Sequence, residues 1–419
     1  MQYKSKSKPI VEIGRELNAG TILEGSVRKA GNRVRITIQM IDAIHDKHLW
    51  AESFDRELLD IFAIQSDVAE RVAEALRIQL LSAEKKDIER RATESSEAFT
   101  QYLKGRYHWN ERTREGNDKA VKYFEEAVKL DPKYALAYAG LADCYIIYGD
   151  YGWMEPKDAF PKAEQAISRA VELDPRLAEP HASLGVVYNS YEAEWDKAEK
   201  EFKQAIELKP SYATAHMWYG LLLMFLGRYD EAYDQLQSAR ELDPLSRVVG
   251  VNLGALLLYT GKTRDAIEQF ETAIEANPDF PYIHTVLGFA YYLESRINEA
   301  ISELRKGLVM SGGDPEPKAD LACILGFAGF RDEADKLLEE LKEHSRTVYI
   351  SKVKIAQILF AFRRADEAFD YLDKAYAEKS LTADHGSTLL NLRVLPWFSE
   401  ARKDPRWGAL EKRLGLSGV

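Results

Sequence analysis

Histidines are the side chains of this 419-residue sequence with the most obvious capacity for acid–base or metal chemistry. Three of the eight, His181, His216 and His284, occupy matching places in a repeated pattern, 35 and 68 residues apart. One packing role at a repeat position explains all three, whereas a metal site would require the three rings to meet. We therefore interpret them as structural residues.

Other metal and catalytic motifs are weak or absent in the sequence. His45 and His48 follow a predicted strand, but only Asp46 accompanies them, which does not complete a zinc site. No phosphate-binding loop, dinucleotide fingerprint, zinc-protease motif or nucleophile elbow occurs. Cys144 and Cys323 are too few and too distant for a disulfide framework. We predict no catalytic residue, metal or cofactor, and hence no enzyme.

The composition is that of an ordinary globular protein, with 46% hydrophobic residues, 30% charged residues and a net charge of −11. Nucleic-acid binding needs clustered basic residues, so this charge argues against it. The longest apolar run, HMWYGLLLMFLGRYDEA at residues 216–232, is closed by Gly227 and Arg228. It is shorter than the ~20 apolar residues of a membrane span, and the amino terminus lacks a signal peptide. We predict a soluble, cytoplasmic protein without a membrane partner.

Internal repeats dominate the rest of the chain. Five prolines each follow a helix-ending signal, at Pro132, Pro175, Pro210, Pro244 and Pro278. Proline cannot continue a helix. The spacing of 34 or 35 residues between most of them is typical of a helix-turn-helix repeat.

Alignment on these prolines reveals columns of small and large residues. A small residue recurs in each first helix at Ala142, Gly185, Gly220, Gly254 and Gly288. An alanine recurs in each second helix at Ala163, Ala198, Ala232, Ala266 and Ala300. A larger residue follows four positions later at Ile167, Phe202, Leu236, Phe270 and Leu304. This spacing predicts a packed stripe where two helices approach closely. Gly227 and Gly261 fall in the turns between paired helices, where glycine tolerates left-handed backbone angles.

The columns resemble those of the tetratricopeptide repeat. The resemblance implies a mainly α fold, an α-solenoid of about eight repeats over residues 96–380. A small α+β domain at residues 1–95 precedes it. The closing stretch, residues 381–419, contains LPWFSEARKDPRWGALEKRLGL, whose polar and aromatic mix predicts capping helices.

The resemblance also implies that the first helix of each pair lines a concave groove. Its positions carry over to Met217, Leu221, Met224, Phe225, Val251, Ala255, Leu258, Tyr259, Tyr282, Thr285, Phe289, Tyr292, Leu293, Phe327 and Phe360. An apolar lining of this extent predicts a covering partner, either an amphipathic helix or an extended peptide. The alternative is that a tightly wound superhelix, or the amino-terminal domain, covers this face. The groove lacks the Lys and Asn residues with which chaperone-binding relatives hold a peptide carboxylate.

The second repeat carries nine extra residues in YGDYGWMEPKDAFP, residues 148–161. A surface turn with its own aromatic cluster is the simpler interpretation. The alternative is that Tyr151 and Trp153 contact a partner.

Residues 1–95 have a different pattern. TILEGSVRKAGNRVRITIQMID alternates apolar and polar residues, as in Val34 and Ile36 against Arg33 and Arg35, which is typical of half-buried strands. KHLWAESFD predicts a third strand, and DIFAIQSDVAERVAEALRIQLL predicts a helix. The region resembles the TolB amino-terminal-like domain of bacterial and archaeal repeat-containing regulators, without that domain's first strand and helix. An open sheet edge would allow a homo-oligomer to form.

Three classes of function follow. The leading hypothesis is a noncatalytic scaffold that binds a protein or peptide in the apolar groove, as part of a signalling or regulatory assembly. The second is a regulatory sensor that binds a small apolar ligand. The third, an enzyme, has no residue to support it.

Overall fold

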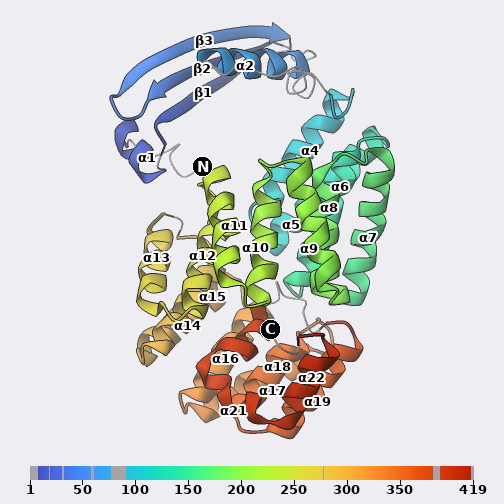
Figure 1. The fold of residues 1–419 in the computed structure, drawn as a ribbon, viewed down its shortest axis with the longest axis vertical. Helices are drawn as coiled ribbons and strands as arrows, with labels where there is room; N and C mark the ends of the chain where they lie inside the picture. The colour runs from blue at the N-terminus through green and yellow to red at the C-terminus, as the bar shows by residue number, and fades with distance from the viewer. Residues whose placement is uncertain are drawn as a thin grey trace. The chain divides into compact units, whose positions relative to one another are not determined.

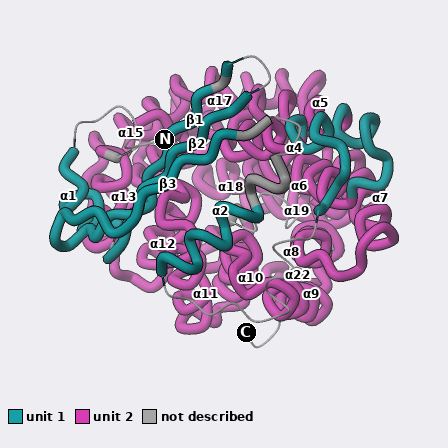
Figure 2. The backbone as a smooth tube through the Cα atoms, turned by 90° about the horizontal axis from the view of Figure 1, so that it is seen from above, with its two compact units in different colours: residues 1–101, 126–134 teal, residues 102–125, 135–419 magenta. Residues whose placement is uncertain are grey.

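The computed structural model describes residues 8–17, 19–30, 33–57, 61–76, 91–276, 278–380 and 387–416. It divides into two compact units (Figure 2). The first comprises residues 1–101 and 126–134, and the second comprises residues 102–125 and 135–419.

The first unit contains a three-stranded antiparallel sheet in the order β1 (Thr21–Ala30), β2 (Arg33–Asp42) and β3 (Lys47–Glu57). Helix α1 (Ile10–Glu16) precedes it, and α2 (Ile61–Ala75) packs against β3. In β2 the side chains of Val34, Ile38 and Met40 are buried, as the predicted alternation requires. The predicted small sheet with a helix is confirmed.

The second unit continues the chain as helix pairs (Figure 1). Eight pairs occupy residues 96–377, and the first of them, α4 and α5, contributes to both units. The pairs are α4 (Ser96–Trp109) with α5 (Arg114–Leu130), α6 (Ala135–Asp150) with α7 (Pro156–Leu173), α8 (Ala178–Val187) with α9 (Trp195–Leu208), α10 (Ala213–Phe225) with α11 (Tyr229–Leu242), α12 (Arg247–Tyr259) with α13 (Thr263–Ala276), α14 (Pro281–Leu293) with α15 (Ile297–Met310), α16 (Pro315–Phe327) with α17 (Arg331–His344), and α18 (Lys352–Ala361) with α19 (Ala365–Ala377). The predicted α-solenoid is confirmed.

The columns of small residues explain how the two helices of a pair approach. The second-helix alanines are completely buried. A Cβ atom added to Gly254 would lie 2.3 Å from the Phe270 ring, and one added to Gly220 would lie 2.8 Å from Leu236. The large residue of one helix therefore fits the space left by the missing side chain of the other.

The turns between paired helices repeat one backbone conformation. Residues with a left-handed φ recur every 34 positions, at Ala193, Gly227, Gly261, Ser295, Gly329 and Arg363. The prediction for Gly227 and Gly261 is confirmed. In the third repeat a π-helical turn, η2 (Tyr188–Glu192), precedes this position.

The carboxy-terminal residues form α20 (Ser387–Val394), a 3-10 turn η3 (Pro396–Phe398), α21 (Ser399–Lys403) and α22 (Pro405–Arg413). Arg406 and Arg413 of α22 lie over the rings of Phe369 and Tyr376 in α19, where they extend the stack of helices. Residues 387–398, which we term the strap, lie instead against the inner face of the repeats. These residues therefore do more than cap the last repeat, which was their expected role. Among the described helices, none is both long and apolar enough to cross a membrane.

Candidate binding site on the inner face of the repeats

The predicted groove residues lie on the first helices of their pairs, but most are not accessible. Phe225 is 2% exposed and Val251 is 1% exposed. The others that are buried are Met217, Met224, Ala255, Leu258, Thr285, Phe289 and Phe360. Those that are partly exposed are Leu221, Tyr259, Tyr282, Tyr292, Leu293 and Phe327. Most of this face is therefore buried within the chain, which favours the alternative of a self-covered face over an open groove.

The strap covers the aromatic residues of this face. The Trp397 ring lies 5.1 Å from that of Tyr292 and 5.9 Å from that of Phe289, measured between centroids. The Phe398 ring lies 5.3 Å from that of Phe327. The aromatic residues expected to receive a partner thus receive a segment of the same chain.

Polar contacts fix the strap along the repeats. Arg393 Nη1 donates a hydrogen bond of 2.6 Å to the carbonyl oxygen of Phe225. The Tyr259 hydroxyl donates one of 2.6 Å to Asn391 Oδ1. Trp195 stacks near the Phe225 ring with centroids 4.9 Å apart. Phe225 is consequently enclosed by its own chain.

The inserted loop of the second repeat also contacts distant residues of the solenoid. Trp153 Nε1 donates a hydrogen bond of 3.0 Å to Asp314 Oδ2, a residue 161 positions away at the start of α16. The Tyr151 and Trp153 rings lie 4.9 Å apart. The loop is therefore more than a surface turn, and within the described structure Trp153 binds the chain itself.

A cavity of 590 Å³ lies behind this loop, within the ~300–1,000 Å³ typical of small-molecule sites. Its aromatic wall consists of Tyr151, Trp153, Phe280, Tyr282 and Phe289. Its polar wall includes Arg112, Thr285, Glu316, Asp320 and Lys354. An adjoining cleft of 20 Å³ is lined by Met217, Leu221, Met224 and Tyr259, so the predicted groove there is almost filled.

Three charged groups form a cluster at one wall of the cavity. Lys354 Nζ lies 2.7 Å from Asp320 Oδ1 and 3.6 Å from Glu316 Oε2. Burial raises the pKa of Asp320, and it raises the pKa of Glu316 to about 7 against the opposing effect of Lys354. Two carboxyl groups thus share one ammonium group.

Sequence reasoning missed Arg112, as it missed Glu316, Asp320 and Lys354. Arg112 lies between α4 and α5 with φ 53°, it is 9% exposed, and its guanidinium lies 3.5 Å from the centroid of the Trp109 ring. Burial lowers its pKa. Nη1 has no hydrogen-bond partner among the described residues. A charged residue in a polar turn is ordinarily exposed to solvent. The extra residues in this turn were the feature of the sequence that could have indicated the burial of Arg112.

The three repeat-position histidines each bond to the second helix of their own repeat. His181 Nδ1 lies 2.7 Å from Glu201 Oε2, and His284 Nδ1 lies 2.7 Å from Glu303 Oε2. His216 Nδ1 lies 2.8 Å from Gln235 Oε1. Over the described ranges, no three His, Cys, Asp or Glu side chains form a group that could hold a metal ion. In the first unit, His45 bonds to Asp42.

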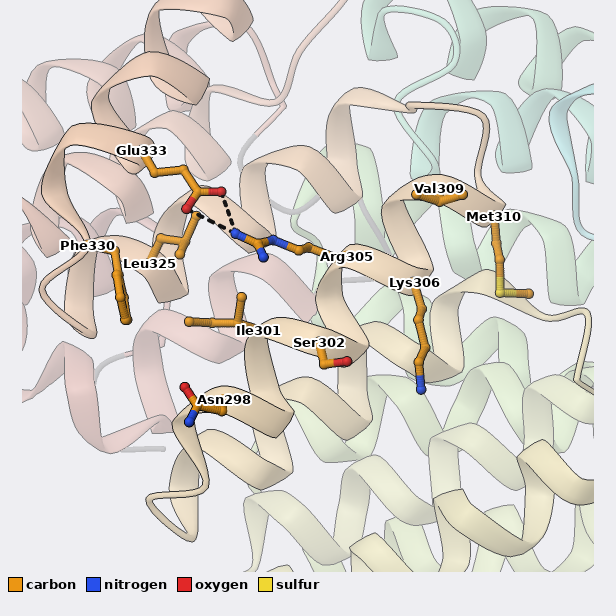
Figure 3. A pocket seen from close by; sticks show the side chains of 10 residues that line it. All are labelled: Asn298, Ile301, Ser302, Arg305, Lys306, Val309, Met310, Leu325, Phe330 and Glu333. Carbon is orange, nitrogen blue, oxygen red and sulfur yellow. Dashed lines mark hydrogen bonds and ion pairs between the residues drawn. The ribbon is translucent and has the colours of Figure 1, made fainter.

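A second pocket, of 620 Å³, lies on α15 and α17 (Figure 3). Arg305 Nη2 lies 2.7 Å from Glu333 Oε1 across it. Val309 at its edge is 78% exposed. This pocket was not predicted, and it is much more open than the cavity behind the loop.

Fold and site together define an α-solenoid of helix pairs whose inner face is covered by its own carboxy-terminal strap. The family model for the tetratricopeptide repeat matches residues 109–152 and 191–246, and a further TPR repeat model matches residues 254–295. The matched residues, about a third of the chain, are tetratricopeptide repeats. Domains of this kind bind proteins and peptides generally.

Curated relatives share only part of their length with this chain. A putative adenylate cyclase 3 of Rhizobium meliloti (strain 1021) is 38% identical over 140 residues, which are 33% of this chain and 24% of that protein. The transcriptional regulator HilA of Salmonella typhimurium is 28% identical over 94 residues, which are 22% of this chain and 17% of HilA. The chain thus spans less than a quarter of each relative.

Solved structures of repeat proteins are also similar. Yeast Tom70 has a TM-score of 0.44 at 19% identity, over 77% of this chain and 68% of that one. YrrB, described as a TPR protein with an unusual peptide-binding site, has a TM-score of 0.31 at 20% identity, over 47% of this chain and 98% of its own.

Proposed function

We propose that the protein is a noncatalytic interaction scaffold whose inner face binds an aromatic segment of a partner protein. The observation that carries this proposal is the seating of Trp397 and Phe398 among Phe289, Tyr292 and Phe327. A face that accommodates such a segment from its own chain has the shape and chemistry to accommodate one from another chain.

The strap supplies the features expected of a bound peptide. Two adjacent aromatic residues act as anchors, the half-buried Trp397 and the buried Phe398, and such aromatic anchors commonly dominate interface energies. Arg393 and Asn391 add hydrogen bonds that fix the register. A partner segment with a similar Leu-Pro-Trp-Phe sequence would have to displace the strap, so the scaffold would be closed until such a partner binds.

The test is competition with a synthetic peptide. A fluorescent peptide of residues 387–398, STLLNLRVLPWF, is titrated by anisotropy onto the full chain and onto its Trp397→Ala variant. Loss of an anchor worth ~2 kcal/mol should weaken the internal strap, so the variant should bind the peptide at least ~10-fold more tightly than the wild type.

Two controls accompany this titration. Phe330→Ala removes an exposed aromatic residue outside the inner face and should leave peptide affinity unchanged. A peptide with alanine in place of its tryptophan should not bind. The proposal fails if a folded Trp397→Ala variant binds neither peptide, or binds both equally.

We further propose that the chain contains no catalytic centre and works within a cytoplasmic signalling or regulatory assembly. The absence of catalytic motifs supports the first point. The names of the relatives, an adenylate cyclase and a transcriptional regulator, support the second. The sheet and α2 are compatible with a TolB amino-terminal-like domain. We propose that its edge strand β1, on which Leu23 and Val27 are exposed, pairs with a second copy.

A sensor that binds a small apolar ligand is the second candidate function. The cavity of 590 Å³ with its aromatic wall favours it. The cavity shares Phe289 with the Trp397 contact, and Asn391 of the strap also lines it, so ligand and strap meet on one face.

A further inference from the structure

The cavity behind the inserted loop has a guanidinium, that of Arg112, on which Asp143 and Asp150 act only electrostatically. Arg112 lines the cavity, is more than nine-tenths buried and forms no ion pair within the described residues. Arg106 nearby is instead paired with Asp143, with 2.6 Å between Nη1 and Oδ2. Asp143 is thus already engaged, and it also accepts a hydrogen bond from Ser183. A buried guanidinium that forms no ion pair destabilises the folded protein unless an anion binds to it.

The cavity also has an excess of carboxyl groups. Glu115 pairs with Lys119, and Asp118 accepts a hydrogen bond from Tyr148. Asp314 accepts one from Trp153 and also interacts electrostatically with Arg114, which lines the cavity too. That leaves Glu316 and Asp320 with the single ammonium group of Lys354. Glu316 Oε2 has no hydrogen-bond partner in the described structure. This wall can therefore accept a further cation.

We infer that the cavity binds a small zwitterion of the amino-acid and dipeptide class, with its carboxylate at Arg112, its ammonium group at Glu316 and Asp320, and apolar side chains against the aromatic wall. This inference rests on the second candidate function and names its ligand. A simple anion would meet the surplus carboxyl groups, whereas a purely apolar ligand would leave Arg112 Nη1 and Glu316 Oε2 without hydrogen-bond partners.

Thr285 adds a third observation. Its Oγ1 atom is buried without a hydrogen-bond partner, and the residue lines the same cavity as Phe289 and Tyr282. Buried polar atoms without partners are uncommon in proteins, and here Arg112, Thr285 and Glu316 all line one cavity.

The test uses one dipeptide in four forms. L-leucyl-L-phenylalanine, its N-acetyl form, its C-terminal amide and the doubly capped form are titrated by calorimetry onto the full chain. The free dipeptide should bind most tightly, and each cap should weaken binding at least ~10-fold. The amide cap removes the carboxylate of the ligand, so in Arg112→Gln this cap should no longer weaken binding. The acetyl cap removes the ammonium group, so in Glu316→Gln this cap should weaken binding less than in the wild type. Arg305→Gln, which removes a guanidinium from the pocket of Figure 3, should behave as the wild type.

The outcomes separate the two claims. If the doubly capped dipeptide binds as tightly as the free one, regardless of Arg112, the zwitterion inference is overturned while the apolar sensor remains supported. If none of the four forms binds, both are overturned. If the free dipeptide binds equally well to the wild type, Arg112→Gln and Glu316→Gln, the ligand lies elsewhere, and the inference is again overturned.

Discussion

Buried charged side chains set this protein apart from a simple stack of apolar helices. Asp143 and Asp150 of α6 are both almost inaccessible. Asp143 is compensated by Arg106 and Ser183. Burial raises the pKa of Asp150 from its ordinary 3.8 to about 7, although a hydrogen bond from Ser190 acts in the opposite direction. The native protein consequently holds a proton at Asp150 that the unfolded chain releases.

The stability of the protein should therefore fall as the pH rises from about 4 to about 7. Over that window the native state binds more protons than the unfolded state, so the free energy of unfolding decreases by up to ~1.4 kcal/mol per pH unit for one such group. Asp150→Asn should flatten this slope, with its largest stabilising effect above pH 7. Urea denaturation at several pH values measures it, and an unchanged slope would contradict the assignment.

Individual residues also show where sequence reasoning succeeds and where it stops. His181, His216 and His284 could be assigned to packing because a repeat position gives them a common environment. Arg112 could not be found in this way, because its burial depends on Trp109 and on a loop from the next repeat. Periodicity describes contacts within a repeat and carries no information on contacts across the inner face.

Helix pairs and their turns follow one local rule throughout the solenoid. The left-handed turn position recurs every 34 residues, and Ser295 and Arg363 occupy it where other repeats have glycine. Left-handed backbone is less favourable for residues with a side chain. Around Ser295 the surrounding helix pair keeps the same close contact as the glycine-turn repeats, with Gly288 against Leu304.

Two glycines of α12 allow this contact to be tested within one helix. Gly254→Ala should destabilise the protein by ~1–3 kcal/mol, because the new Cβ would lie 2.3 Å from the buried Phe270 ring. Gly250→Ala, whose Cβ would meet nothing within 4 Å, should be neutral or stabilising by ~0.5–1 kcal/mol. Thermal denaturation of both variants gives the comparison. Equal effects would contradict the packing rule.

The elements that sequence reasoning placed best are those with a periodic signal. The repeat helices and the sheet of the first unit were predictable, because their apolar residues follow the period of a helix or of a strand. The strap was not, although its residues LPWF were visible as an aromatic cluster. Nothing in a short apolar segment specifies which of several apolar faces it will cover.

Long-range contacts of the carboxy-terminal residues, within the strap and beyond it, change the way in which the second unit as a whole holds together. In an open solenoid each repeat contacts only its neighbours, and stability is close to a sum of local terms. Here Trp195 Nε1 donates a hydrogen bond of 2.7 Å to the carbonyl oxygen of Leu414, 219 residues away. Lys379 pairs with Glu192 at 2.6 Å. Repeats that are distant in sequence are thereby coupled.

Unfolding of this unit should accordingly be more cooperative than in an open solenoid. Trp397→Ala should lower the midpoint of urea denaturation and also the slope m, because parts of the solenoid then unfold separately. Val309→Ala, at a highly exposed position, should leave both unchanged. Near-UV and far-UV circular dichroism should give coincident transitions for the wild type but separate ones for Trp397→Ala. A lower midpoint with an unchanged slope would contradict the coupling.

The hydrogen bond between Trp195 and Leu414 also has a consequence for protein synthesis. The third repeat is complete more than 200 residues before Leu414 is made. Until the ribosome has released that end of the chain, Phe289, Tyr292 and Phe327 have no Trp397 or Phe398 to cover them. The nascent protein therefore presents an open inner face to chaperones and partners, and an assembly formed during translation would not have to displace the strap.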